Sequence, residues 1–204
     1  MNINTQIQRH FVTLNGRRGI RQVHYRRAGS GPPLVMLHQS PKSSREYEPL
    51  MERWAEHFTV IAPDTPGFGQ SDPLPVSRIT LEELAECVIE FADAIGLETF
   101  PVYGFHTGGG VAIALADAYP RRVPAAVANG LVMPTPEERT DVLGNYFPAF
   151  EPKWDGSHLT WMWARMREQT VFFPWFAHTL ANRMDYTMPG PEALQENVRE
   201  MLQS

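Results

Sequence analysis

A histidine between two glycines is the feature of this sequence that is best suited to chemistry. The stretch 101–110 (PVYGFHTGGG) places His106 at the centre of a G-x-H-x-G spacing, with Gly104 before it and Gly108 after it. Backbone N–H groups at the start of a helix disfavour a nearby positive charge, so the imidazole of His106 is expected to be neutral. A neutral imidazole can take a proton from water or attack a carbonyl carbon, and either step could open an ester-type bond.

The residues on both sides of His106 predict the elements that position it. Glycines two residues before and two residues after the central residue let a strand and a helix pack closely around it. The segment 111–119 consists almost entirely of small and apolar residues, which is typical of a helix buried against a sheet, and Pro120 ends it. A strand, a sharp turn and a buried helix are therefore expected here, with the side chain of His106 projecting over the sheet.

Hydrophobic patterns predict the remaining strands and helices. Two alternating segments are expected to form a pair of strands around a turn at Asn15-Gly16, and three apolar segments are expected to be strands of a sheet. Two capping-box spacings, Ser43 with Glu46 and Thr80 with Glu83, predict helices, the first of them running to about Glu56. Strands that alternate with helices indicate a mostly parallel sheet. The expected strands outside the His106 segment are 9–14, 20–25, 34–37, 58–62 and 123–128.

Three motifs resemble those of the α/β-hydrolase fold family. The segment around His106 is similar to the family's G-x-S-x-G nucleophile elbow, residues 38–41 (HQSP) to its H-G-x-P oxyanion loop, and residues 64–71 (DTPGFGQS) to its D-x-P-G-[FY]-G-x-S segment. They occur in the family's order, and the resemblance covers roughly residues 7–130, with the epoxide hydrolase, haloalkane dehalogenase and esterase-like branch as the most similar. It implies an α/β-hydrolase-like, mostly parallel sheet with flanking helices and a helical cap, truncated before the last strands.

The sequence departs from the family pattern at the positions that carry the chemistry. His106 stands where the family has Ser, Asp or Cys, and Gln39 stands where it usually has glycine. The resemblance implies that the backbone N–H groups of Gln39 and Thr107 hold the oxyanion. The family's acid and histidine follow the elbow in later strands, and this chain reaches Ser204 before such strands are expected, so no triad can be assigned. Either His106 has a chemical role of its own, or it is a substitution in a protein without catalysis.

The C-terminal part differs in composition from the part before it. Residues 1–133 are expected to form the α/β-hydrolase core, and residues 134–204, which are rich in proline and tryptophan, a helical cap or lid. Glu137 and Glu138 lie near the place where some relatives have the catalytic acid, but the start of a cap helix explains them better. Aromatic side chains of the cap either line an apolar pocket or only pack the cap onto the core. The expected pocket residues are His38, Phe105, Trp161, Trp163, Phe172 and Trp175.

Two of the candidate side chains also have simpler explanations. His38 is expected to keep the oxyanion loop in shape through hydrogen bonds. Cys87 is more consistent with packing on its helix than with a role as a nucleophile. The histidines and Asp64 show no ligand spacing for a metal, so neither a metal nor any other cofactor is expected.

Charge and composition narrow the range of functions. A net charge of −5 without long charged blocks does not indicate nucleic-acid binding, and no apolar run approaches the ~20 residues of a membrane span. The start of the chain lacks the apolar segment of a signal peptide, and a single cysteine fits a reducing compartment, so a cytoplasmic location is expected.

The expected function follows from these observations. The first hypothesis is a hydrolase of a small apolar ester-type substrate with His106 at the elbow. The alternatives are a non-catalytic homologue that binds a small apolar ligand or a partner protein, and an inactive truncated hydrolase. The strand 123–128 is expected at the edge of the sheet, where a second copy of the chain or a complementary chain would cover it.

Overall fold

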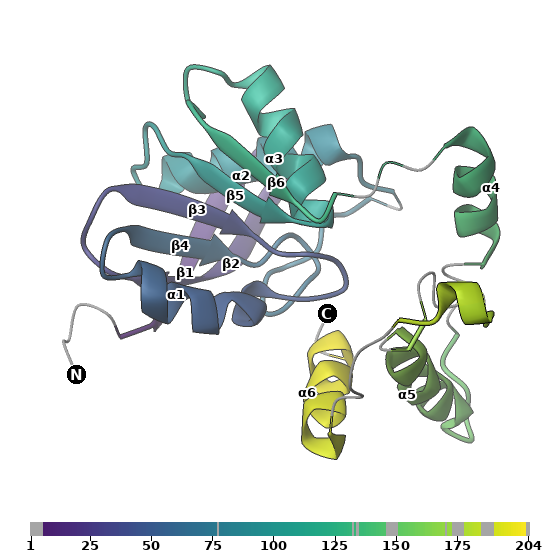
Figure 1. The fold of residues 1–204 in the computed structure, drawn as a ribbon. Coiled ribbons are helices and arrows are strands. Elements are labelled where there is room, and N and C mark those ends of the chain that lie inside the picture. The colour runs from purple at the N-terminus through teal and green to yellow at the C-terminus, as the bar shows by residue number, and fades with distance from the viewer. Residues whose placement is uncertain are drawn as a thin grey trace. The chain divides into compact units, whose positions relative to one another are not determined.

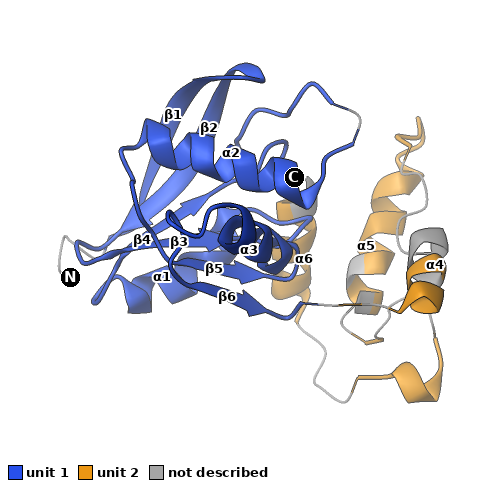
Figure 2. Ribbon diagram, turned by 90° about the horizontal axis from the view of Figure 1, so that it is seen from above, with its two compact units in different colours: residues 1–132, 203–204 blue, residues 133–202 orange. Residues whose placement is uncertain are grey.

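A computed structural model describes residues 6–76, 78–131, 133, 135–145, 151–169, 171–172, 178–184 and 190–202. The chain divides into two compact units, which Figure 2 distinguishes by colour. The first unit ends at residue 132 and contains a sheet with its flanking helices, and the second comprises residues 133–202. The assignment of residues 134–204 as a cap stays a prediction.

The first unit is built on a mixed, mostly parallel sheet (Figure 1). Its strands lie in the order β1-β2-β4-β3-β5-β6. β1 and β2 form an antiparallel hairpin, β2 pairs antiparallel with β4, and the pairs β4–β3, β3–β5 and β5–β6 are parallel. The expected α/β fold class is confirmed. The strands are β1 (Gln8–Gly16), β2 (Gly19–Ala28), β3 (Pro33–Leu37), β4 (Thr59–Pro63), β5 (Val102–Phe105) and β6 (Ala126–Asn129).

Helices cover both faces of this sheet. On one face α2 (Leu81–Ala94) and α3 (Thr107–Ala118) pack in one core cluster with Val35 and Leu37 of β3, and on the other face α1 (Glu48–Trp54) packs with Met36. Figure 2 shows α2 and α3 on the side of the sheet opposite α1. Three successive residues of β3 are thus fully buried, as is typical of an inner strand of a parallel sheet covered on both faces.

The β1–β2 turn and the first helix differ from the sequence prediction. The turn consists of Arg17 and Arg18 rather than Asn15-Gly16, because Gly16 pairs with Gly19 and the Arg18 guanidinium binds Glu86 of α2 at 2.6 Å. The segment after Ser43 opens with a 3₁₀ turn, η2 (Ser44–Tyr47), and continues as α1 to Trp54. Ser43 accepts a hydrogen bond from the N–H of Arg45, but Glu46 does not complete a capping box, because its carboxylate binds elsewhere.

The second capping box is confirmed at the start of α2. Thr80 accepts from the N–H of Glu83 at 3.2 Å, and the Glu83 carboxylate accepts from the N–H of Thr80 at 2.8 Å. The apolar face of α2, including Leu84, Val88 and Phe91, is buried as the spacing predicts. α2 therefore packs with α3 in the same core cluster.

Strand β6 lies at the end of the sheet in the described part of the chain. It begins at Ala126, three residues later than the expected strand, because Val123 is buried in the core cluster with α3. All four residues of β6 are exposed. Whether a second copy of the chain covers this edge, as expected from the sequence, stays a prediction.

The second unit contains α4 (Pro136–Asn145), α5 (Ser157–Gln169), the short 3₁₀ helix η3 (Leu180–Asn182) and α6 (Pro191–Leu202). A capping box of Thr135 and Glu138, with bonds of 2.8 and 3.2 Å, opens α4. Glu137 and Glu138 thus stand at a helix start, as their preferred interpretation requires. Over the residues that the structure describes, no helix combines the length and the apolar character needed to cross a membrane.

Candidate functional site

The turn between β5 and α3 holds His106 in an unusual backbone conformation. Its φ of 52° and ψ of −111° make it the one non-glycine residue with positive φ in the described part of the chain. Its N–H donates to the carbonyl oxygen of Asn129 at 2.8 Å, and its own carbonyl accepts from Gly109 and Gly110. The end of β6 and the first turn of α3 therefore hold His106 at both of its peptide groups.

Two glycines make the sharp turn sterically feasible. A Cβ atom on Gly104 would run into the backbone of Gly108, and a Cβ atom on Gly108 would run into the carbonyl oxygen of Leu37. Both contacts are with backbone, which cannot move aside as the end of a side chain can. The spacing of the sequence motif is thus explained by close backbone packing around His106.

The imidazole of His106 is half-buried, and no charged group in the described part of the chain contributes to its pKa shift. Burial lowers its pKa below the ordinary value of 6.5, so the ring is neutral near pH 7. Its ring centroid lies 6.4 Å from that of Phe105, whose side chain packs partly buried against the α1 side of the core. Within the described residues, no side chain or backbone group forms a hydrogen bond with this imidazole.

The two residues expected to form the oxyanion hole differ in their hydrogen bonds. The N–H of Thr107, the first residue of α3, has no acceptor among the described residues, whereas its hydroxyl accepts weakly from the N–H of Ser40 at 3.4 Å. The N–H of Gln39 donates to Oε1 of Glu46 at 2.9 Å, and the Gln39 side-chain amide donates to Oε2 of Glu46 at 2.8 Å. The Gln39 N–H thus donates to Glu46 in this structure, and its expected role in holding an oxyanion stays a prediction.

The buried side chain of His38 joins the oxyanion loop to the loop after β4. Its side chain is buried, Nδ1 donates to the carbonyl of Gln39 at 2.8 Å, and Nε2 accepts from the N–H of Thr65 at 2.9 Å. This pattern fixes a neutral imidazole with its proton on Nδ1. These bonds fit the structural role expected for His38, and its assignment to the substrate pocket stays a prediction.

Asp64 is the centre of a buried network that the sequence did not predict. Its carboxylate accepts from Nδ1 of His24 at 2.8 Å, from the N–H and hydroxyl of Ser44 at 2.8 and 2.5 Å, and from the N–H of Gln70 at 2.9 Å. Burial alone would raise the pKa of Asp64, but the bonds from His24, Ser44 and Gln70 outweigh it and lower the pKa to about 2. This carboxylate therefore joins the segment after β3 to the loop after β4.

The aromatic residues expected in the pocket lie mainly in the second unit. The guanidinium of Arg165 lies 5.0 Å from the centre of the Trp161 ring, Trp163 is 38% exposed, and the ring of Phe172 lies 4.8 Å from that of His178. Trp175 lies outside the described residues. A pocket that these side chains form with Phe105 and His106 stays a prediction.

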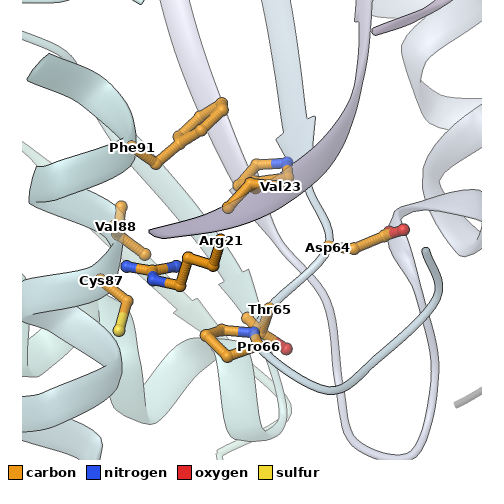
Figure 3. A pocket seen from close by; sticks show the side chains of 9 residues that line it. Arg21, Val23, Asp64, Thr65, Pro66, Cys87, Val88 and Phe91 are labelled. Atoms are coloured by element: carbon orange, nitrogen blue, oxygen red, sulfur yellow. The ribbon is translucent and has the colours of Figure 1, made fainter. Parts of the chain in front are cut away.

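A separate small pocket of about 10 Å³ lies between β2, α2 and the loop after β4 (Figure 3). It is lined in part by Arg21, Cys87 and Pro66, and none of its lining residues belongs to the His106 turn. Burial raises the pKa of the Cys87 thiol, which fits the packing role expected for it. No cluster of three potential metal ligands occurs among the residues that the structure describes.

Sequence relatives match about half of this chain. A soluble epoxide hydrolase of Corynebacterium sp. (strain C12) is 39% identical over 114 residues, which are 56% of this chain and 38% of the relative. A putative non-heme haloperoxidase of Mycobacterium phage D29 is 37% identical over 100 residues, which are 48% of this chain and 36% of the relative. The chain thus spans little more than a third of the length of these curated relatives.

Solved structures share the fold over most of the chain. A membrane phospholipase A, a bacterial virulence factor, matches with a TM-score of 0.69 at 22% identity over 98% of this chain and 60% of its own. A hydrolase from Pseudomonas aeruginosa PA01 matches with a TM-score of 0.67 at 19% identity over 94% of this chain and 66% of its own. The model of the alpha/beta hydrolase fold family matches residues 32–197. The chain belongs to the α/β-hydrolase fold family.

Proposed function

We propose that this chain is a hydrolase of small, largely apolar ester-type substrates in which His106 activates the attacking water. The observation that carries the proposal is the placement of a neutral, half-buried imidazole at a positive-φ turn between β5 and α3. The neighbouring N–H of Thr107, which has no acceptor among the described residues, supports the same proposal, because a tetrahedral intermediate needs such a donor for its oxygen.

The proposed reaction uses His106 as a general base and then as a general acid. The imidazole takes a proton from a water molecule, whose oxygen attacks the carbonyl carbon of the ester, and the carbonyl oxygen becomes an oxyanion near the N–H of Thr107. The intermediate collapses, the C–O bond to the alcohol breaks, and the imidazolium returns its proton to the leaving alkoxide. Acid and alcohol are the products, and the imidazole is neutral again.

A transient acyl-imidazole is the second route that the same ring allows. In that case Nε2 or Nδ1 of His106 attacks the carbonyl carbon directly, the alcohol leaves, and water then cleaves the acyl–nitrogen bond. The two routes differ in a measurable way, because only the second gives a burst of alcohol that precedes steady turnover.

One observation favours a different class of function. The imidazole of His106 has no hydrogen-bond partner among the described residues, so no described group orients the ring or stabilises its charged form. Catalytic histidines usually have such a partner. The alternative proposal is a non-catalytic member of the family that binds a small apolar ligand, or an inactive hydrolase.

A pair of histidine variants separates these proposals. H106Q removes the base but keeps a polar side chain, whereas H57Q changes an exposed histidine at the end of the α1 segment. For hydrolysis of p-nitrophenyl butyrate, H106Q is expected to lower kcat/KM by ~10²-fold or more, while H57Q stays within two-fold of the parent chain. Equal turnover by H106Q and the parent chain would exclude His106 from catalysis.

A further inference from the structure

The Gln39–Glu46 pair joins a residue of the oxyanion loop to the 3₁₀ turn that follows it. Gln39 donates both its backbone N–H and its side-chain amide to the two oxygens of one carboxylate, at 2.9 and 2.8 Å. Hydrogen bonds to an ionised acceptor are roughly twice as strong as bonds between neutral groups. The carboxylate of Glu46 is therefore held strongly by Gln39, although the Glu46 side chain is only partly buried.

The loop that binds Glu46 lies directly against the His106 turn. Gly108 is pressed against the carbonyl oxygen of Leu37, and a Cβ atom on it would lie only 2.9 Å from that of His38. The N–H of Ser40 approaches the hydroxyl of Thr107 at 3.4 Å. Gln39 lies between these contact points in sequence, so the N–H that binds Glu46 belongs to the segment packed against the start of α3.

The bound carboxylate limits the ability of the Gln39 N–H to bind an oxyanion. One N–H group makes one good hydrogen bond, so the N–H of Gln39 cannot hold an oxyanion while it donates to Glu46. A negative charge at this position also repels a developing oxyanion, and the repulsion is strong where water is partly excluded. Burial, and to a lesser extent the same charge, raises the pKa of the neighbouring Tyr47, whose hydroxyl donates to the carbonyl of Leu37 at 2.6 Å.

We propose that Glu46 is an internal gate on the oxyanion loop: its carboxylate blocks the donors of Gln39, and a bound substrate or anion must displace it. The inference rests on the proposed function in that it assigns the Gln39 N–H to the same oxyanion. It adds a closed state of the loop, in which both donors of Gln39 bind Glu46, and an open state in which Glu46 has turned away from Gln39. Glu46 acts in this account as a positioning residue and touches no reacting atom.

The alternative is that Glu46 only holds the loop in shape. The two explanations predict opposite changes in the binding of an oxyanion mimic when the carboxylate is removed. A gate gives tighter binding of an oxyanion mimic to the variant, because the N–H is released. If Glu46 only stabilises the loop, the variant without the carboxylate binds the mimic more weakly and is less stable, because the loop has lost its hydrogen bonds to Glu46.

The test measures binding of monoethyl methylphosphonate, a stable tetrahedral anion, from the shifts of the backbone ¹⁵N–¹H signals of residues 39 and 107. The variants are E46Q, which keeps the shape without the charge, and E46A, which removes the group. E52A is the matched control, because Glu52 is an exposed carboxylate on the adjacent helix α1 and its loss changes the net charge equally.

The gate predicts that E46A binds the phosphonate at least ten-fold more tightly than the parent chain and E46Q at least three-fold, with E52A within two-fold. The signal of residue 39 should shift on binding in both Glu46 variants. Unchanged or weaker binding by both variants, with their fold retained, would overturn the proposal. An equal gain in E52A would also overturn it, because the effect would then be general electrostatics.

A third variant keeps the test decisive if both Glu46 variants fail to fold. Q39G retains the backbone N–H and removes only the side-chain amide, so Gln39 offers Glu46 one bond in place of two. Binding two- to five-fold tighter than that of the parent chain supports the gate, and weaker or equal binding contradicts it. Phosphonate binding needs no turnover, so these results are independent of the H106Q result. If H106Q loses hydrolysis but the Glu46 variants bind the phosphonate no more tightly, only the gate is refuted. If H106Q keeps full hydrolysis but the Glu46 variants bind more tightly, only the proposed hydrolysis is refuted.

Discussion

Gly108 lies so close to the carbonyl oxygen of Leu37 that a Cβ atom on this residue would run into that oxygen. The contact joins the first turn of α3 to the end of β3, which are 71 positions apart in sequence (108 − 37). It leaves no room for a side chain at the second position after His106. The position of the imidazole therefore depends on backbone packing that only glycine permits.

Replacing Gly108 with alanine should disrupt this packing. G108A is expected to lower the free energy of unfolding by about 3 kcal/mol, because the new methyl group meets fixed backbone. G110A is the matched control, since a Cβ atom there meets only the side chain of Leu81, at 3.0 Å, and alanine favours the helix. Urea denaturation of both variants measures the difference, and equal stabilities would contradict the proposed close packing.

The backbone conformation of His106 should carry a measurable cost. Non-glycine residues held at unusual positive φ cost of order 1–3 kcal/mol, and glycine adopts such angles freely. H106G is therefore expected to be about 1 kcal/mol more stable than the parent chain, after the greater entropy of glycine in the unfolded state is subtracted. Thermal unfolding with circular dichroism measures this change, and a less stable H106G would show that the imidazole contributes more packing than the backbone costs.

Asp64 should make the stability of the chain sensitive to acid. Its pKa is lowered from the ordinary 3.8 to about 2 in the folded state, so its contribution is fully present above pH ~5 and is lost as the pH falls towards 2. The shift corresponds to about 2 kcal/mol. D64N should flatten this part of the stability curve, whereas D117N, at an exposed position of α3, should leave it unchanged. A parallel acid transition in D64N and the parent chain would contradict the assigned network.

Local patterns allowed much of the fold to be predicted. The capping box at Thr80 and Glu83 formed as expected because both partners belong to one helix turn. The same spacing at Ser43 and Glu46 gave a wrong expectation, because the carboxylate found stronger donors on Gln39. Sequence spacing does not reveal such competition from a neighbouring loop.

In the candidate site, too, local features could be predicted from the sequence and long-range contacts could not. The position of His106 follows from the spacing of Gly104 and Gly108, which acts over a few residues. The bonds of His38 to Thr65 and of His24 to Asp64 join residues that are 27 and 40 positions apart, and only the folded sheet brings them together. A polar His24 among the alternating residues of β2 was the one sequence signal that could have pointed to a buried partner.

The pH dependence of kcat/KM tests the central claim, that the neutral imidazole of His106 activates water. Burial lowers the pKa of this group, so the base is neutral, and active, above a pH that lies below 6.5. For p-nitrophenyl butyrate the parent chain should therefore show a constant rate above pH ~7 and a fall of about ten-fold per pH unit well below an apparent pKa under 6.5. H106Q should lose the activity, and with it the fall in rate at acid pH. An apparent pKa above 6.5 for the parent chain would contradict the role of His106 as the base. The same rate and the same fall at acid pH in H106Q would contradict it as well.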